Sequence, residues 1–152
     1  LERVATVHGV RFVNDSKATN ANATAQALAV YPRIYWIAGG VAKDGGIDEL
    51  ARFFPRVARA YLIGQAAGEF SDTLRDKAPV TMAGNLEAAV KLAFEDARAS
   101  GEPHPVVLLS PACASYDQFR SYEERGDKFK AYVAALSGGE RNGARPAPGN
   151  SA

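Results

Sequence analysis

The residues that could do chemistry are concentrated first in Asn14–Asn20 (Asn-Asp-Ser-Lys-Ala-Thr-Asn), where a short apolar run ends and a helix-like run begins. A strand that turns directly into a helix leaves the first N–H groups of that helix unpaired, and these groups attract anions. The segment adds a carboxylate at Asp15, an ammonium at Lys17 and a hydroxyl at Thr19. A simple helix cap needs only one or two of these side chains. The segment therefore predicts an anion site, with capping alone as the alternative.

Two more polar segments follow predicted strands. Residues 39–46 hold four glycines around Lys43, directly after an apolar run of strand length. Residues 110–115, Ser-Pro-Ala-Cys-Ala-Ser, follow another such run and end at Ser115. Parallel strands would place these segments at one edge of a sheet, where ligands of open α/β folds bind. Lysines, hydroxyls and backbone amides around a single acid, Asp15, favour an anionic ligand such as a carboxylate or a phosphate.

These segments need a sheet to hold them together, and the remaining sequence predicts one. Short apolar runs alternate with helical periodicity, which is typical of a Rossmann-like α/β fold with a mainly parallel sheet and helices on both faces. Residues 1–13 have the pattern of a hairpin, which predicts an N-terminal antiparallel strand at the edge of the sheet. Pro55 interrupts an apolar stripe and predicts a short or kinked helix. The predicted strands are 34–38, 60–63, 80–82 and 106–109, and the predicted helices are 18–30, 48–57, 66–75, 85–100 and 117–136.

The composition limits the classes of partner. The chain has 152 residues, of which 47% are hydrophobic, and this is enough for one domain with a buried core. Eighteen basic and seventeen acidic residues leave a net charge of +1, so we expect no nucleic-acid and no membrane surface. No apolar run approaches the ~18 residues of a membrane helix, and the first residues lack a signal-peptide layout. The expected partners are small molecules or proteins.

A lone cysteine, Cys113, fits a reducing compartment, and the cytoplasm is the expected location. Two distant histidines do not predict a metal site made by this chain. The sequence begins without methionine, so we expect a piece of a longer chain. Residues 137–152 contain nothing apolar larger than alanine, and we expect a flexible tail there, after a domain of residues 1–136.

The sequence does not predict catalysis by this chain alone. Cys113 follows the strand that His104 precedes, so about 20 Å of extended chain separates the two residues and excludes a nucleophilic pair. The Gly-x-x-x-x-Gly-Lys-[Ser/Thr] loop that holds phosphates in NTPases is absent from the sequence. We therefore do not expect a complete ATP-using enzyme.

Two long motifs resemble the C-terminal domain of the Mur ligase family. The first is Asn14–Asn20, already described. The second comprises residues 110–119, Ser-Pro-Ala-Cys-Ala-Ser-Tyr-Asp-Gln-Phe, followed by Glu124-Arg125-Gly126 and Phe129. The resemblance spans residues 1–136, and the combination of the two motifs is similar to the D-glutamate-adding member of the family.

The resemblance implies a three-domain cytoplasmic enzyme of peptidoglycan synthesis, of which the N-terminal and central domains are missing here. Such an enzyme uses ATP and Mg²⁺ to activate a nucleotide-sugar carboxylate as an acyl phosphate, which the amine of D-glutamate then attacks. The C-terminal domain receives the amino acid and closes over the ATP that the central domain holds. We expect a monomer.

The resemblance also implies roles for individual residues. The implied D-glutamate contacts are Thr19, Lys43, Ser115, Tyr116 and Tyr122, and the residues implied to face the nucleotide are Asn14, Asp15 and Lys17. A lysine with hydroxyl and amide donors suits the two carboxylates of D-glutamate. The family usually has Leu and Phe at the positions of the two tyrosines.

Two other interpretations stay open. The chain could be the C-terminal domain of a sibling ligase that adds L-alanine, a diamino acid or polyglutamate. It could also be a non-catalytic Rossmann-like binding module whose glycines and lysines are structural. Because the phosphate-binding loop is missing, we expect no ligase activity from this chain alone, and weak binding of D-glutamate at best.

Overall fold

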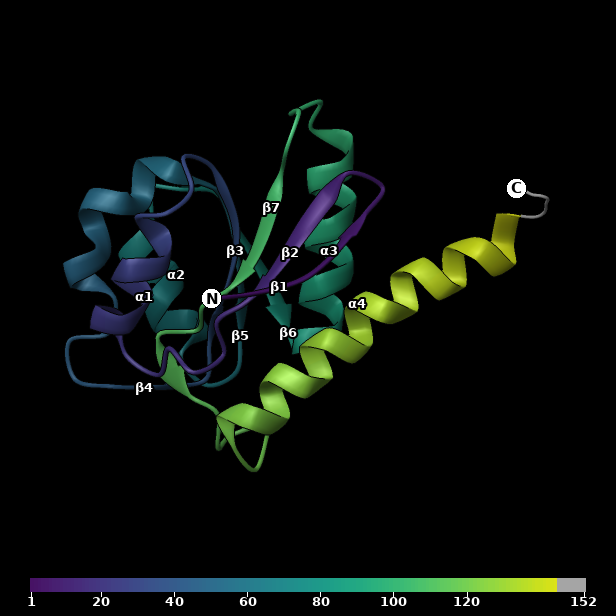
Figure 1. The fold of residues 1–152 in the computed structure, drawn as a ribbon. Coiled ribbons are helices and arrows are strands. Elements are labelled where there is room, and N and C mark those ends of the chain that lie inside the picture. Colours follow the sequence, from purple (N-terminus) through teal and green to yellow (C-terminus); the bar gives the residue numbers. More distant parts are fainter. Residues whose placement is uncertain (145–152) are drawn as a thin grey trace.

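The fold is built on a six-stranded sheet, seen in a computed structural model that describes residues 1–144 and the side chains of residues 1–137 (Figure 1). The strand order is β1-β2-β7-β3-β5-β6. All neighbours in this sheet are parallel except β1 and β2, which are antiparallel. The predicted mainly parallel sheet is therefore confirmed. The strands are β1 (Glu2–Val7), β2 (Val10–Asn14), β3 (Ile34–Gly39), β5 (Val57–Ile63), β6 (Val80–Gly84) and β7 (Val106–Leu109).

The predicted N-terminal hairpin is confirmed, and β1 forms one edge of the sheet. Its turn lies at His8 and Gly9, which have φ angles of +48° and +81°. Positive φ at both central residues is the condition for a tight hairpin turn whose twist matches that of the strands. Glycine meets this condition without strain, so the His8-Gly9 pair fixes where the chain reverses.

Helices cover both faces of the sheet, as predicted. One face carries α1 (Ala21–Leu28), the 3-10 helix η1 (Asp48–Arg56) and α2 (Ala67–Leu74), packed on Trp36 and its neighbours. The other face carries α3 (Leu86–Ala99) and α4 (Tyr122–Ala144), packed on Phe12 and its neighbours. Figure 1 shows α1 and α2 on one side of the sheet and α3 and α4 on the other. Each face of the sheet therefore packs against an apolar layer of helices.

Asparagine caps begin two of these helices. Asn20 Oδ1 accepts a hydrogen bond from Ala23 N at 2.8 Å, and Asn85 Oδ1 accepts one from Ala88 N at 2.9 Å. Each bond satisfies one N–H that a helix start leaves unpaired. The cap of α1 is thus Asn20, so capping does not explain the polar side chains at Asp15 and Ser16.

Two parts of the fold differ from the prediction. A two-stranded antiparallel sheet, β4 (Val41–Ala42) with β8 (Cys113–Ala114), joins two segments that the sequence analysis treated as loops. The predicted bounds of the last helix, 117–136, are wrong at both ends, because α4 begins at Tyr122 and runs to Ala144. Once a helix is nucleated, each further residue adds a backbone hydrogen bond without a new nucleation cost, so a helix can extend past its last apolar residue even over residues of low helix propensity. The flexible tail stays a prediction, and residues 145–152 lie outside the described part.

Among residues 1–144, no helix is long and apolar enough to cross a membrane. The same residues hold no cluster of three or more histidine, cysteine or acidic side chains that could bind a metal ion.

Candidate functional site

The three polar segments meet at the carboxyl edge of the sheet, and we call residues 14–19, 39–46 and 110–116 together the rim. The third segment lies between the other two and bonds to both. Ala112 N donates to Ala18 O at 3.0 Å, and Gly39 N donates to Pro111 O at 3.1 Å. The pairing of β4 with β8 extends the second of these junctions. Figure 1 shows β4 and the start of α4 at the same end of the molecule.

This arrangement brings Thr19, Lys43 and Ser115 onto adjoining segments. Thr19 follows Ala18, whose carbonyl accepts the bond from the third segment. Lys43 follows β4 and Ser115 follows β8, and these two strands are paired. Lys43 is exposed, Thr19 is half-buried, and Ser115 is 2% exposed. The structure thus brings together the backbone positions that the sequence analysis expected at one edge.

Two glycines of the second segment serve the packing of the rim itself. Gly39 and Gly40 have φ angles of +132° and +129°. A Cβ atom on Gly39 would overlap the Ile63 carbonyl oxygen, and one on Gly40 would overlap the Ala114 carbonyl oxygen. These glycines are therefore needed where backbone meets backbone. Gly39 and Gly40 therefore have a structural role at this junction.

Asp15 lies in a buried polar cluster. Its backbone N donates to Leu109 O at 2.8 Å, which continues the pairing of β2 with β7. Its Oδ2 accepts a hydrogen bond from Ser110 Oγ at 2.8 Å, and Ser110 Oγ lies 3.0 Å from Thr24 Oγ1. Burial raises the pKa of Asp15 above its ordinary value, and the bond from Ser110 works in the opposite direction. A carboxylate is thus held at the rim at a cost in solvation.

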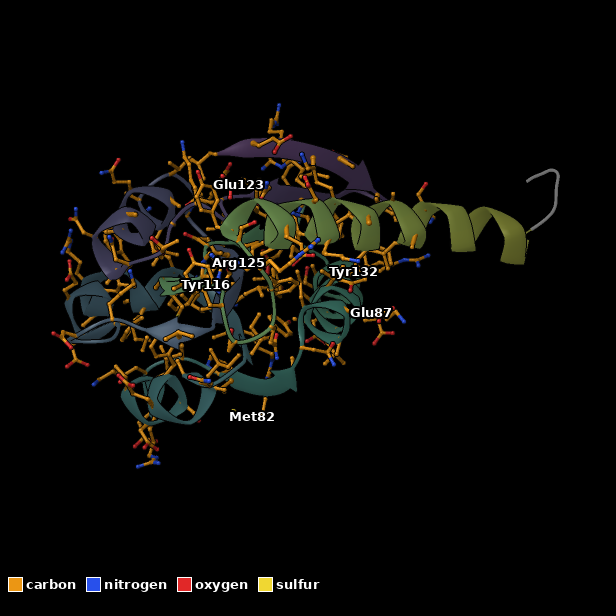
Figure 2. All side chains as sticks on the ribbon, turned by 90° about the horizontal axis from the view of Figure 1, so that it is seen from below. Met82, Glu87, Tyr116, Glu123, Arg125 and Tyr132 are labelled. Carbon is orange, nitrogen blue, oxygen red and sulfur yellow. The ribbon has the colours of Figure 1, made fainter. Side chains whose placement is uncertain are left out.

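Arg125 ties the first and third segments of the rim to α4. The side chain is 1% exposed, and its pKa is lowered to about 10 by burial, so it stays protonated at neutral pH. Its Nε donates to Ser16 Oγ at 2.8 Å and Nη2 donates to Ser16 O at 2.6 Å. Its Nη1 donates to Cys113 O at 3.1 Å. Figure 2 shows Arg125 at the start of α4, with Tyr116 on the segment that precedes the helix.

The two tyrosines of the predicted site differ in environment. Tyr116 is 74% exposed, and Tyr122 is 42% exposed. The backbone carbonyl of Tyr122 accepts a hydrogen bond from Ser16 Oγ at 2.7 Å, so the start of α4 is fixed to the rim. The neighbouring Glu123 carboxylate raises the pKa of the Tyr122 phenol.

Two clefts border the first segment of the rim, and both are lined by Asp15 and Lys17. The first cleft, of about 350 Å³, lies between this segment and α4 and includes Asn14 and Tyr122. The second, of about 390 Å³, lies between the segment and α1. Thr19, Lys43, Ser115 and Tyr116 line neither cleft. Of the residues predicted to face a nucleotide, Asp15 and Lys17 line both clefts and Asn14 lines the first. Most of the predicted amino-acid contacts lie on the adjoining segments.

Sequence reasoning assigned no individual role to four polar residues that organise the rim, although three of them carried a signal. Arg125 stands four residues before Phe129 and eight before Val133, on the buried face of α4. Thr24 stands between buried positions of α1, and Ser110 follows a buried strand. A polar residue at an apolar position of a helix signals a buried hydrogen-bonding role. The fourth is Asp117, whose Oδ2 accepts from Gln65 N at 2.9 Å; nothing in the sequence pattern indicates this bond.

Comparison with known proteins shows the family of this chain. A family model described as "Mur ligase, glutamate ligase domain" matches residues 1–113. A UDP-N-acetylmuramoylalanine–D-glutamate ligase of Phenylobacterium zucineum is 56% identical over 144 residues, which is 95% of this chain and 30% of that protein. Proteins of the same name match from Caulobacter vibrioides, with 59% identity over 91% of this chain and 29% of the relative, and from Rhodopseudomonas palustris, with 61% over 84% and 27%.

The chain thus spans about 30% of the length of the curated relatives it matches. The family model covers most of the chain and ends inside the third rim segment, at Cys113. The relatives extend the match beyond it, to as much as 95% of the chain. The protein belongs to the Mur ligase family, whose glutamate ligase domain this chain contains.

Proposed function

We propose that this chain is the amino-acid-binding C-terminal domain of an ATP-dependent ligase. In this proposal the ligase adds D-glutamate to UDP-N-acetylmuramoyl-L-alanine during peptidoglycan synthesis. The observation that carries the proposal is the junction of the three rim segments at one edge of the sheet. The names of relatives that are 56–61% identical supply the substrate. The domain acts in the cytoplasm, as a monomer, with the N-terminal and central domains of the same enzyme.

The amino-acid side of the proposed site is made by Thr19, Lys43, Ser115, Tyr116 and Tyr122. D-glutamate carries two carboxylates, and an exposed ammonium such as that of Lys43 can pair with one of them. Hydroxyl and backbone N–H groups on the adjoining segments can bind the other. Tyr116 and Tyr122 stand where the resemblance implies Leu and Phe. A contact made through the backbone N–H of Tyr122 would not depend on this change of side chain.

The nucleotide side is made by Asn14, Asp15 and Lys17. Lys17 is exposed and lines both clefts, where its ammonium can meet a phosphate oxygen. ATP and Mg²⁺ would be held mainly by the central domain, and Asp15 is the acid that this chain offers to that side. Mg²⁺ neutralises phosphate charge when it is bound. Asn14 Oδ1 accepts from Ser16 N at 3.0 Å and so shapes the loop that presents Lys17.

The test uses a chimera of the Caulobacter vibrioides relative in which this chain replaces the matching segment. Phosphate release is measured with ATP, UDP-N-acetylmuramoyl-L-alanine and one amino acid at a time. We expect turnover with D-glutamate, and none with L-alanine, meso-diaminopimelate or L-glutamate. Turnover with one of these others would favour a sibling ligase, and an inactive but folded chimera would favour a binding module. The 152-residue chain alone should release no phosphate.

A further inference from the structure

Ser110 is not among the proposed ligand contacts, and its side chain is completely buried next to Asp15. Its Oγ lies 2.8 Å from Asp15 Oδ2 and 3.0 Å from Thr24 Oγ1. Its backbone carbonyl accepts a hydrogen bond from Trp36 Nε1 at 2.8 Å and one from Thr24 Oγ1 at 3.4 Å. Ser110 is therefore fixed by hydrogen bonds from β3 and from α1.

Among residues 1–137, Asp15 is the only buried acidic residue. A buried carboxylate is costly unless hydrogen bonds or an opposite charge compensate it. The buried cation of the rim, Arg125, donates its bonds to Ser16 and Cys113. The hydrogen-bond donor to Asp15 Oδ2 is instead the neutral hydroxyl of Ser110, and the Leu1 amino group lies 3.9 Å from Oδ1 on the cleft side. A neutral donor holds a carboxylate in place without cancelling its charge, so the carboxylate can still accept bonds from a ligand.

We propose that Ser110 is a positioning residue, which holds Oδ2 of Asp15 so that Oδ1 is presented to a donor group of a ligand in the clefts. Asp15 lines both clefts, so one fixed carboxylate can accept a hydrogen bond from a ligand in either cleft. The identity of the ligand, a nucleotide, rests on the proposed function. The placement of the carboxylate by Ser110 does not rest on it.

The direct test is a carboxyl ¹³C NMR titration of Asp15 in the 152-residue chain, which covers both faces of its sheet with its own helices. Ser110→Ala removes the bond that favours the ionised form, so we expect the pKa of Asp15 to rise by about 1, a tenfold gain in proton affinity. Thr24→Val is the matched control, because Thr24 is equally buried in the same cluster but is not bonded to Asp15. We expect it to leave the pKa of Asp15 in place.

The charged groups around the first cleft are the same in both variants, so they do not bias the comparison; they are the Leu1 amino group, Glu2, Lys17, Glu123, Asp127 and Lys130. An unchanged pKa in Ser110→Ala, or equal shifts in both variants, would overturn the proposal. Should Ser110→Ala fail to fold, Ser110→Cys keeps a weaker donor at this position. It should raise the pKa in the same direction by a smaller amount, and an unchanged value would again overturn the proposal.

The chimera separates this inference from the proposed function. There we expect Ser110→Ala to raise the KM for ATP several-fold, and Thr24→Val to leave it unchanged. A shifted pKa in a protein without ligase activity would contradict the proposed function and support the positioning role. An unshifted pKa in an active ligase would contradict the positioning role and support the proposed function.

Discussion

Arg125 is the residue on which the shape of the rim depends most. Arg125→Met keeps the bulk of the side chain but removes three donated hydrogen bonds, and it leaves the carbonyls of Ser16 and Cys113 without these donors. We expect a loss of about 3 kcal/mol in the free energy of unfolding, measured by urea denaturation. Arg120→Met is the control, because the Arg120 side chain is 91% exposed. Equal urea midpoints for the two variants would contradict this stabilising role of Arg125.

We expect the buried carboxylate of Asp15 to lower the free energy of unfolding at neutral pH. Burial raises its pKa, so the folded protein holds the proton more tightly than the unfolded chain does. The free energy of unfolding therefore falls as the pH rises from the ordinary pKa of 3.8 through the raised value. We expect Asp15→Asn to be more stable than the wild type at pH 7, with a difference that shrinks as the pH approaches about 4. Urea denaturation across this pH range measures it. A less stable Asp15→Asn at pH 7 would mean that the charge stabilises the fold.

The start of α4 is an element shaped by its contact with the rim. A Cβ atom on Gly126 would lie 3.0 Å from Asn14 Nδ2 and 3.4 Å from Ser16 Cβ. Asn14 cannot move freely, because it is bonded to Ser16 N and to Glu2. We expect Gly126→Ala to destabilise the chain by about 1 kcal/mol, although alanine is the better helix former. Thermal unfolding measures the change.

Gly68 in α2 is the matched control for this prediction, because a Cβ atom there meets nothing within 4 Å. Gly68→Ala should stabilise the chain by about 0.5 kcal/mol through helix propensity alone. If Gly126→Ala stabilised as much as Gly68→Ala, the contact between α4 and the rim would be looser than the distances indicate.

Most elements could be predicted because their signals are local. The apolar stripe of α3 and its cap at Asn85 are visible within one stretch of sequence. The pairing of β4 with β8 could not be predicted, because it joins short segments far apart in the chain and has no periodicity of its own. The 3-10 form of η1 also depends on context; Pro55 predicted only that a regular helix would be disturbed.

At the scale of the whole molecule, alternation of strands and helices predicted the sheet, and its parallel strands predicted that the polar segments would share an edge. The strand order was not predictable, because it depends on which long-range pairs form and not on any local pattern. The same limit hid the cluster of Ser110, Thr24 and Asp15. The sequence can indicate that Thr24 and Ser110 are polar residues at buried positions, but only the pairing of β2 with β7 brings Ser110 to Asp15.

The proposed function depends on the rim as the amino-acid side of a ligase, and one measurement tests this most directly. It is the KM for D-glutamate of the Lys43→Ala chimera, with Lys77→Ala as the control, since Lys77 is an exposed lysine just before β6, at the opposite edge of the sheet. We expect the KM to rise at least about tenfold in Lys43→Ala, with kcat changed far less, and to stay unchanged in Lys77→Ala. An unchanged KM in a folded, active Lys43→Ala chimera would contradict the proposed role of the rim in binding D-glutamate.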